Sequence, residues 1–317
     1  MANGKRVNAL AGESVAEVST ETQTNVTKAP PRARSRSANR PKLGQNFLVD
    51  VSAVQRIVEA LGDISQKIVI EIGPGKGVLT DKLAVRSGHL IAIELDRVLA
   101  AQLRMRYNRM PNVEIIEGDV LTMDFSSMLG PRPGMLVDRS PHALPTTARL
   151  VGNIPYYITS DILLRLFSFH SSFDEVILML QKEVADRLLA QPGKSEYGLL
   201  SATAQLYAKV EKLFVVPPGA FSPPPKVYSE VLRLTMRPKL KELGVPEKEF
   251  ISFLKLSFAQ KRKTLVNNLK ESYSPAALRA ALKAAGLRSD VRAEAVSLEK
   301  AATLFRELQP AAKPLAS

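Results

Sequence analysis

The fold of this 317-residue chain is decided by one stretch, residues 66–80, which reads QKIVIEIGPGKGVLT. Its first half is a run of apolar, β-branched residues, which is typical of a buried strand in a parallel sheet. The run ends in a glycine-rich turn, Glu71 to Gly77, and a helical pattern follows. Closely spaced glycines at a strand-to-helix turn let the backbone approach a ligand. The stretch therefore predicts the first strand and the ligand-binding turn of an α/β fold.

The same alternation of strands and helices continues along the chain. Helical patterns are predicted around these strands, beginning with one at residues 51–61. Further strands are predicted at residues 89–96, 113–121, 150–154 and 175–181. A proline-rich stretch, residues 126–148, contains too many breakers to be regular. Strands that alternate with helices of this length indicate a parallel sheet with helices on both faces, the Rossmann-like class.

Three parts of the chain differ in composition. Residues 1–40 are rich in Ala, Ser, Thr and Arg, so we expect a disordered basic tail that serves as a nucleic-acid-binding arm or is simply solvated. Residues 41–240 form the expected α/β domain. Residues 241–317 show three helical patterns and predict a small basic helical domain, one helix of which carries the segment QKRK.

Charge gathers at the two ends of the chain. The net charge is +13, of which residues 1–42 carry +5 and residues 241–317 carry +6. A nearly neutral middle with basic ends indicates a polyanionic partner such as nucleic acid. The alternative is that the basic residues only promote solubility.

Composition excludes several other kinds of site. Cys is absent, which removes disulfides, thiolate zinc sites and cysteine nucleophiles. The three histidines are scattered and offer little material for a metal site or a catalytic triad, so no metal is expected. No apolar run reaches the roughly 18–20 residues of a membrane span, and the N-terminus lacks the apolar core of a signal peptide. We therefore expect a cytoplasmic protein without membrane contact.

Acidic side chains follow the second and third strands. Gly73 and Gly75 end the first strand, Glu94 ends the second and Asp119 ends the third. Ligands of such folds collect at the carboxyl ends of the strands, where Glu94 suits a ribose diol and Asp119 an adenine amine. The turn alone fits a dinucleotide, S-adenosylmethionine or no ligand. Its G-x-G-x-G spacing, however, differs from the G-x-G-x-x-G expected for NAD, which argues against an oxidoreductase.

The fourth strand ends in an amide, a proline and a tyrosine: Asn153, Pro155 and Tyr156. An exocyclic adenine amine is a poor nucleophile because its lone pair is delocalised into the ring. The Asn153 side-chain oxygen and the Pro155 carbonyl are suitable acceptors for its two hydrogens. Tyr156 offers a face on which an extruded base can stack, a contact worth about 1–3 kcal/mol. The alternative is a strand-ending turn with a packed tyrosine.

From about residue 42 to residue 269 the chain resembles the ribosomal RNA adenine dimethyltransferase family. The motifs that carry the resemblance occur in the family's order: LGQNFLVD, VIEIGPGKGVLT, IAIELD, IIEGDVL, VGNIPYYITSDIL, FSPPPKVYSEVLRL and FLKLSFAQKRKTLVNNL. The resemblance implies a Rossmann-like, S-adenosylmethionine-dependent methyltransferase sheet followed by a small α-helical domain. The long helical tail and FSPPPKVYSEV are more similar to the family's small-subunit branch.

Residue roles follow from the resemblance at the matching positions. It implies that Tyr156 and Phe221 sandwich the target adenine, and that Asn153 bridges cofactor and base. The residues it implies for cofactor binding are Asn46, Leu48, Gly73, Gly75, Glu94, Asp119 and Asn153. The basic residues Lys261, Arg262 and Lys263 are expected to bind RNA, although such a run is also an ordinary solvated face.

The resulting hypothesis is transfer of methyl groups from S-adenosylmethionine to two adjacent adenosines near the 3′ end of small-subunit rRNA, giving N6-dimethyladenosine. The expected partner is the immature small subunit, and a monomer is expected. Two alternatives are a large-subunit methyltransferase that confers antibiotic resistance and a non-catalytic ribosome assembly factor.

Overall fold

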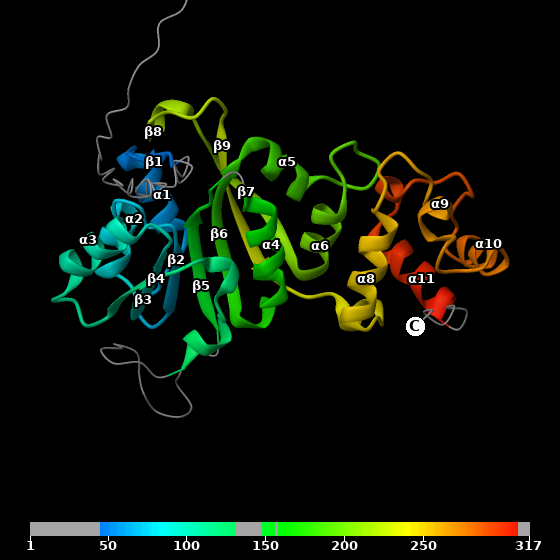
Figure 1. The fold of residues 1–317 in the computed structure, drawn as a ribbon, viewed down its shortest axis with the longest axis horizontal. Helices are drawn as coiled ribbons and strands as arrows, with labels where there is room; N and C mark the ends of the chain where they lie inside the picture. The colour runs from blue at the N-terminus through cyan, green and yellow to red at the C-terminus, as the bar shows by residue number, and fades with distance from the viewer. Residues whose placement is uncertain (1–44, 131–146, 156–157, 310–317) are drawn as a thin grey trace, which may run out of the picture. The chain divides into compact units, whose positions relative to one another are not determined.

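The computed structural model describes residues 45–130, 147–155 and 158–309. A seven-stranded sheet of order β4-β3-β2-β5-β6-β9-β7 forms its centre (Figure 1). The strands are β2 (Ile68–Ile72), β3 (His89–Glu94), β4 (Val113–Glu117), β5 (Ala148–Asn153), β6 (Phe173–Gln181), β7 (Ala208–Val216) and β9 (Ser229–Met236). The first five run parallel, which confirms the predicted alternation of strands and helices.

The sheet also contains an antiparallel pair that the sequence analysis did not predict. Strand β9 pairs antiparallel with both β6 and β7. Residues of β7 alternate between buried and exposed positions, as expected for an edge strand with one solvated face. The sheet is therefore mixed, and only its β4-to-β6 portion is parallel.

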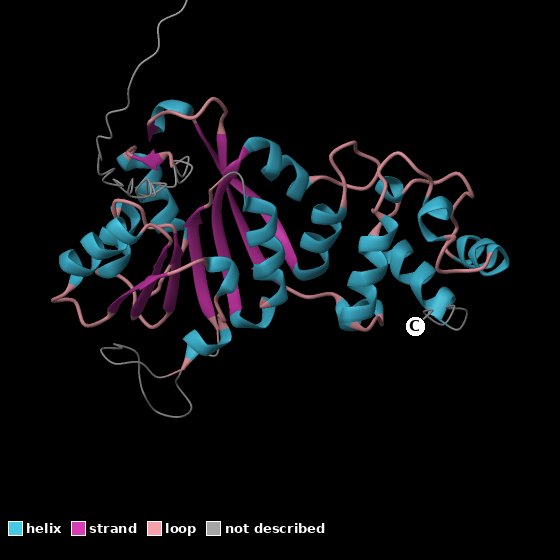
Figure 2. Ribbon diagram, in the orientation of Figure 1, coloured by secondary structure: helices cyan, strands magenta, loops and turns pink. Residues whose placement is uncertain are grey.

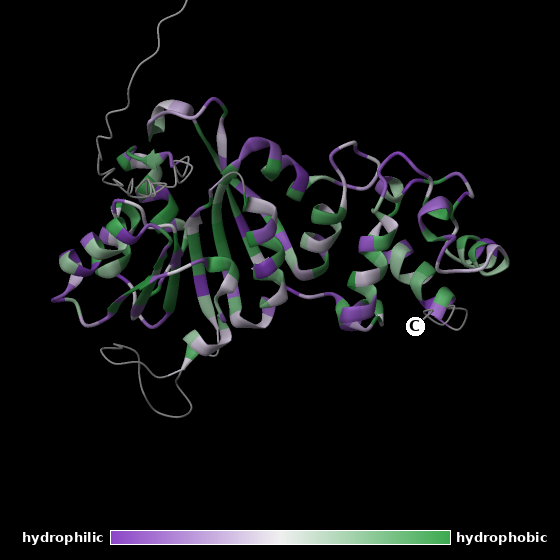
Figure 3. Ribbon diagram, in the orientation of Figure 1, coloured by the Kyte–Doolittle hydropathy of each residue, from purple (hydrophilic) through white to green (hydrophobic). Residues whose placement is uncertain are grey.

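Helices cover both faces of the sheet (Figure 2). One group packs with Val69, Leu90 and Val151, and the other with Ile70, Ile91 and their neighbours. The first group is α1 (Val51–Ala60), α2 (Val78–Ala84) and α3 (Arg97–Tyr107). The second is α4 (Thr159–Ser168), α5 (Lys182–Leu189) and α6 (Leu199–Tyr207). Such two-sided burial explains why the central strands β2 and β3 are buried along their whole length and largely apolar (Figure 3).

The chain after residue 239 is helical, as predicted. Its elements are α7 (Leu240–Leu243), α8 (Glu247–Ser257), α9 (Leu265–Leu269), α10 (Pro275–Ala284), the 3₁₀ turn η6 (Ala293–Ala295) and α11 (Leu298–Leu308). Ser274 caps α10 by accepting a hydrogen bond from Ala277 N at 3.2 Å. The buried core continues from the sheet and α6 into these helices through residues such as Phe250 and Phe305. Among the described residues, no helix is both long and apolar enough to cross a membrane.

The prediction that the segment QKRK lies on a helix is wrong. Helix α8 ends at Ser257 and α9 begins after Thr264, so Lys261, Arg262 and Lys263 lie in the turn between them. The Asn268 side chain donates to the Ser257 carbonyl at 2.7 Å, which satisfies a carbonyl group at the end of α8. Thr264 then starts α9 by accepting from Asn267 N at 3.3 Å. These side-chain bonds replace the backbone bonds of a continuous helix.

A short antiparallel ribbon stands apart from the main sheet. It joins β1 (Phe47–Leu48) to β8 (Phe221–Ser222), which follows the 3₁₀ turn η5 (Pro218–Ala220). The Val49 N–H also donates to the Ala220 carbonyl at 2.8 Å. The segment that precedes α1 is therefore fixed to residues 217–225, here called the proline-rich loop, which precede β9.

Candidate active site

The glycine-rich turn between β2 and α2 shapes one side of the site. Gly73, Gly75 and Gly77 have φ angles of +66°, +58° and +83°, which L-residues with a Cβ rarely adopt. A Cβ on Gly75 would lie 3.0 Å from the Phe47 ring, so a side chain there would also collide. The Gly73 N–H donates to the Ile93 carbonyl at 3.0 Å. The turn thus lies against β3 and keeps its backbone open toward the cavity.

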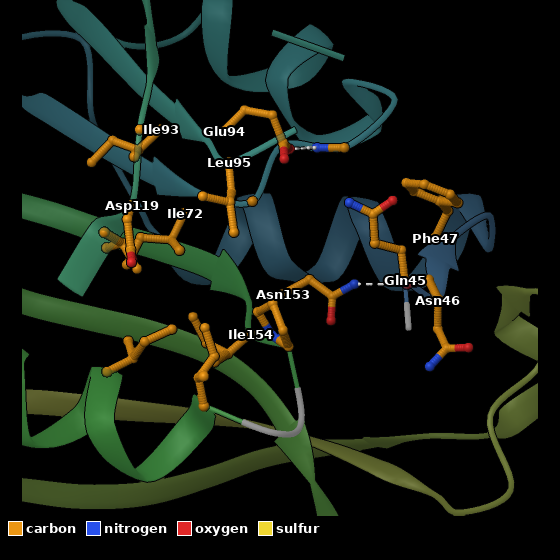
Figure 4. A pocket seen from close by; sticks show the side chains of 17 residues that line it. Gln45, Asn46, Phe47, Ile72, Ile93, Glu94, Leu95, Asp119, Asn153 and Ile154 are labelled. Carbon is orange, nitrogen blue, oxygen red and sulfur yellow. Dashed lines mark hydrogen bonds between the residues drawn. The ribbon is translucent and has the colours of Figure 1, made fainter. Parts of the chain in front are cut away.

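Glu94 holds this turn at the carboxyl end of β3. Its Oε2 accepts from Gly75 N at 2.9 Å and its Oε1 from Asp96 N at 2.9 Å. Burial raises the pKa of the carboxyl, although the two backbone N–H groups oppose that rise. The Glu94 carboxylate lines the cavity next to the turn (Figure 4). It is the acceptor expected for a ribose diol.

Asp119 lies one strand further on, directly after β4. Its Oδ1 accepts from Leu121 N at 2.9 Å and so caps the 3₁₀ turn η1 (Val120–Thr122). Apolar walls from Ile93 and Val120 lie beside it in the same cavity. A carboxylate bordered by flat apolar surface suits the amine edge of an adenine ring.

Asn153 ends β5 on the opposite side of the cavity. Its Nδ2 donates to the Asn46 carbonyl at 3.1 Å, and the amide oxygen is turned away from Asn46 (Figure 4). Only the NH₂ group can donate to a carbonyl, so this bond fixes which way the amide faces. The oxygen is therefore oriented as an acceptor.

Pro155 also lines the cavity, and its carbonyl has protein partners. It accepts from the Thr159 hydroxyl at 3.1 Å and from Ile158 N at 3.3 Å. A carbonyl offers two lone pairs. For the predicted role, a ligand amine has to replace one of these donors, and the Thr159 hydroxyl is the one that can rotate away.

The remaining predicted base-binding residues are placed differently. Tyr156 lies outside the described residues. Phe221 is 3% exposed, packs in the core beside α1 and does not line the cavity. The structure therefore brings Asn153 and Pro155 together without the Phe221 ring, whose stacking role stays a prediction.

The N-terminal segment contributes more to the cavity than the sequence suggested. Asn46 lines it as predicted, whereas Leu48 is buried in the core and does not. Sequence reasoning missed Phe47 and Leu95, which also line it. The Leu95 side chain is 47% exposed, and this exposure of an apolar residue beside the cavity can be seen only in the folded structure.

The cavity fits S-adenosylmethionine. It is an open cleft with about 830 Å³ of empty space, open solvent included. Carboxylates of Glu94 and Asp119 end neighbouring strands, the glycine turn leaves room for the ligand, and apolar side chains separate the polar groups. The residues that line it are Gln45, Asn46, Phe47, Ile72, Gly73, Gly75, Ile93, Glu94, Leu95, Gly118, Asp119, Val120, Asn153, Ile154, Pro155, Ile158 and Ile162. In the described part of the chain, no three His, Asp or Glu side chains gather as metal ligands.

The predicted RNA-binding residues lie in another part of the structure. Lys261, Arg262 and Lys263, here called the basic turn, are exposed between α8 and α9. Lys261 Nζ donates to the Ser195 carbonyl at 2.7 Å, which ties the turn to the loop between α5 and α6. Lys261 and Lys263 line a second groove with Arg187. None of the three lines the cofactor cavity.

The fold and the site together define an S-adenosylmethionine-dependent methyltransferase. The sheet is Rossmann-like, a glycine turn follows β2, and Glu94, Asp119 and Asn153 stand at the carboxyl ends of β3, β4 and β5. Comparison with known proteins narrows the class. The family described as ribosomal RNA adenine dimethylase matches residues 36–310, and the chain belongs to this family. The predicted cofactor and enzyme class, an rRNA adenine dimethyltransferase that uses S-adenosylmethionine, are thereby confirmed.

Individual relatives agree with this assignment. The chain is 59% identical over 282 residues to the ribosomal RNA small subunit methyltransferase A of Koribacter versatilis (strain Ellin345), covering 89% of this chain and 99% of the relative. Among solved structures it is similar to a dimethyladenosine transferase from Plasmodium falciparum (26% identity, TM-score 0.65, 83% of this chain and 98% of that one). It is also similar to the 23S rRNA methyltransferase ErmE (28% identity, TM-score 0.59, 83% and 99%).

Proposed function

We propose that the chain dimethylates the exocyclic amines of two adjacent adenosines near the 3′ end of small-subunit rRNA, during biogenesis of that subunit. The relative at 59% identity is named for the small subunit, whereas ErmE, which is named for 23S rRNA, is 28% identical. This difference favours the small-subunit reaction over the large-subunit alternative. The observation that carries a catalytic function is the Asn153 amide, oriented by Asn46 at the cavity that Glu94 and Asp119 line.

Each residue has a separate task in this reaction. When bound, S-adenosylmethionine supplies an electrophilic methyl group on sulfur. Glu94 accepts from the ribose diol and Asp119 from the cofactor's adenine amine, which fixes the donor along the strand ends. The Asn153 oxygen accepts one hydrogen of the target amine, and the Pro155 carbonyl accepts the other once the Thr159 hydroxyl has moved.

Positioning supplies most of the catalysis, because in-line displacement at carbon needs no covalent enzyme intermediate. Asn153 is neutral, so it orients the amine nitrogen toward the methyl group without acting as a strong base. Two acceptors on one amine also favour a pyramidal nitrogen with an available lone pair.

The Asn153→Ala variant tests the proposal. We expect loss of roughly 10²–10³-fold in turnover, the cost of removing one oriented polar contact to a reacting group. The assay is incubation with labelled cofactor and unmethylated small subunits, followed by nucleoside analysis for dimethyladenosine, with large subunits as the negative control. Asn267→Ala, which removes an exposed amide on α9, is the matched control variant. Near-normal turnover of Asn153→Ala would contradict the assigned role.

We also propose that the helical segment after residue 240 binds rRNA through the basic turn. Neutralising Lys261, Arg262 and Lys263 to Gln is expected to weaken binding and to lower the slope of log affinity against log salt, because phosphate contacts release counterions. A control variant that neutralises Lys270, Arg279 and Lys283, exposed elsewhere in the segment, removes the same charge. Equal slopes for the two triple variants would rule out a specific role for the turn.

We further propose that the chain acts in the cytoplasm as a monomer on immature small subunits. An rRNA substrate and the net charge of +13 support binding to a large polyanion. Sedimentation of the purified chain with and without precursor subunits measures the oligomeric state and the binding to immature subunits. A dimeric free chain, or equal binding to mature fully methylated subunits, would contradict them.

A further inference from the structure

Tyr228 presents an aromatic ring to solvent at the same sheet edge as the active site. Its exposed fraction is 53%. Among the exposed large hydrophobic residues of the described chain, it is the one with an aromatic ring. Its backbone is fixed, because its carbonyl accepts from Lys182 N at 2.9 Å and the next residue, Ser229, pairs with both β6 and β7. A ring of this size that stays in water on a fixed backbone is a ready contact surface.

The strand register places Tyr228 relative to Asn153. Asn153 lies opposite Met179 of β6, and Met179 lies opposite Val231 of β9. Tyr228 precedes Val231 on an antiparallel strand, so it lies beyond the level of Asn153, at the carboxyl ends of the parallel strands. Two strand spacings and three residues of rise separate their backbones, roughly 14 Å. This separation is short enough for an RNA strand with its adenine at Asn153 to place a nearby nucleotide at Tyr228.

Lysines lie on the segments next to Tyr228. Lys226 is exposed two residues before it and forms no ion pair with another described residue. Lys212 pairs with the buried Glu230 at 2.7 Å, and Lys182 lies 3.8 Å from the same carboxylate. Lys182 also pairs with Asp186 at 2.7 Å, so two carboxylates face three lysines. An exposed ring two residues from a lysine that forms no such ion pair matches a base and its phosphate.

We propose that Tyr228 stacks on an unpaired rRNA base close in sequence to the target adenosines, while Lys226 contacts the adjoining phosphate. This inference rests on the proposed function and adds a nucleotide site outside the catalytic cavity. A protein partner is the less suitable occupant, because the surrounding lysines favour an anion over an apolar surface. The site holds the RNA strand beside the cavity and so affects substrate binding more than the chemical step.

Tyr228→Ala tests the stacking site with unmethylated small subunits. Loss of one stacked base is expected to raise KM roughly 5- to 150-fold, with kcat and S-adenosylhomocysteine affinity unchanged. Tyr228→Phe is expected to behave as the wild type, and Tyr228→Leu, which keeps apolar bulk without a ring, as the Ala variant. Val85→Ala, at another exposed position, is the control. Lys226→Gln is expected to lower the salt slope, which Tyr228→Ala leaves unchanged because the ring carries no charge.

Photocrosslinking of the wild-type complex identifies the occupant. The expected product joins the Tyr228 peptide to an rRNA nucleotide near the modified adenosines. An unchanged KM for Tyr228→Ala, an equal loss in Tyr228→Phe, or a crosslink to a ribosomal protein would each overturn the inference. If the wild type itself does not methylate small subunits, the proposed function fails instead, so the two failures are distinguishable.

Discussion

Replacing Glu71 by Gln changes a carboxyl group that the fold keeps out of water. Glu71 belongs to β2, is 1% exposed and faces the helices α1 to α3, just before the glycine turn. Burial raises the pKa of its carboxyl from 4.5 to about 8, the nearby Thr80 hydroxyl opposes the rise, and Glu94 adds to it. Its Oε2 has no hydrogen-bond partner in the described structure, and the Thr80 hydroxyl lies close without completing a bond. The folded protein therefore keeps Glu71 protonated at neutral pH.

The sign of the pH effect follows from this difference. Between pH 4.5 and 8 the folded chain binds one proton at Glu71 and the unfolded chain binds none, so the free energy of unfolding falls as pH rises. The stability that this proton contributes is fully present below the pKa of the unfolded chain, 4.5. It is lost as the pH rises through the pKa of the folded chain, about 8. With these two values, the decrease from pH 5.5 to 7.5 is roughly 2.5 kcal/mol. Gln binds no proton, so the variant lacks this contribution.

Urea unfolding at several pH values measures the effect. Between pH 5.5 and 7.5, we expect the wild type to lose roughly 2.5 kcal/mol of unfolding free energy relative to Glu71→Gln. Glu249→Gln, at an exposed position on α8, is the control and is expected to show no such trend. Parallel pH profiles for wild type and Glu71→Gln would refute the conclusion that the native carboxyl is neutral.

Three further predictions concern the turn, the cofactor and a helix cap. Gly77→Ala is expected to lower the unfolding free energy in urea by roughly 1–3 kcal/mol. The reason is that φ is +83° and a Cβ would lie 2.9 Å from Leu103 Cδ2. An unchanged urea midpoint would contradict this prediction. Glu94→Gln is expected to weaken S-adenosylhomocysteine binding roughly 10- to 100-fold in calorimetry, since a charged acceptor is lost. Thr264→Ala is expected to cost about 0.5–2 kcal/mol in thermal unfolding and Thr264→Ser much less, and equal losses would exclude a capping role.

The strand ends of the cofactor site could be predicted from sequence because each is a local signal. A β-branched run followed by glycines, or by Glu94 or Asp119, gives the strand, its end and the polar group together. Since the carboxyl ends of parallel strands meet at one edge, three local patterns define one cavity. Asn153 could be predicted in the same way, because it is a polar residue that ends an apolar strand.

Contacts between distant segments had no such signal. The β1–β8 ribbon is two residues long on each side, so neither strand shows a periodic pattern, and the buried position of Phe221 depends on it. The break between α8 and α9 depends on the Asn268 side chain reaching back to Ser257, whereas the apolar spacing of the segment suits a continuous helix. Local periodicity does not report such long-range hydrogen bonds.

The ribbon of β1 and β8 has a consequence for how this enzyme can evolve. Asn46 orients the Asn153 amide, and the two residues that follow Asn46 pair with Phe221 and Ser222. A substitution that shifts the proline-rich loop therefore also shifts the amide that receives the base and the wall of the donor cavity. We therefore expect substitutions in this loop to change the affinity for the methyl donor and the affinity for the RNA together.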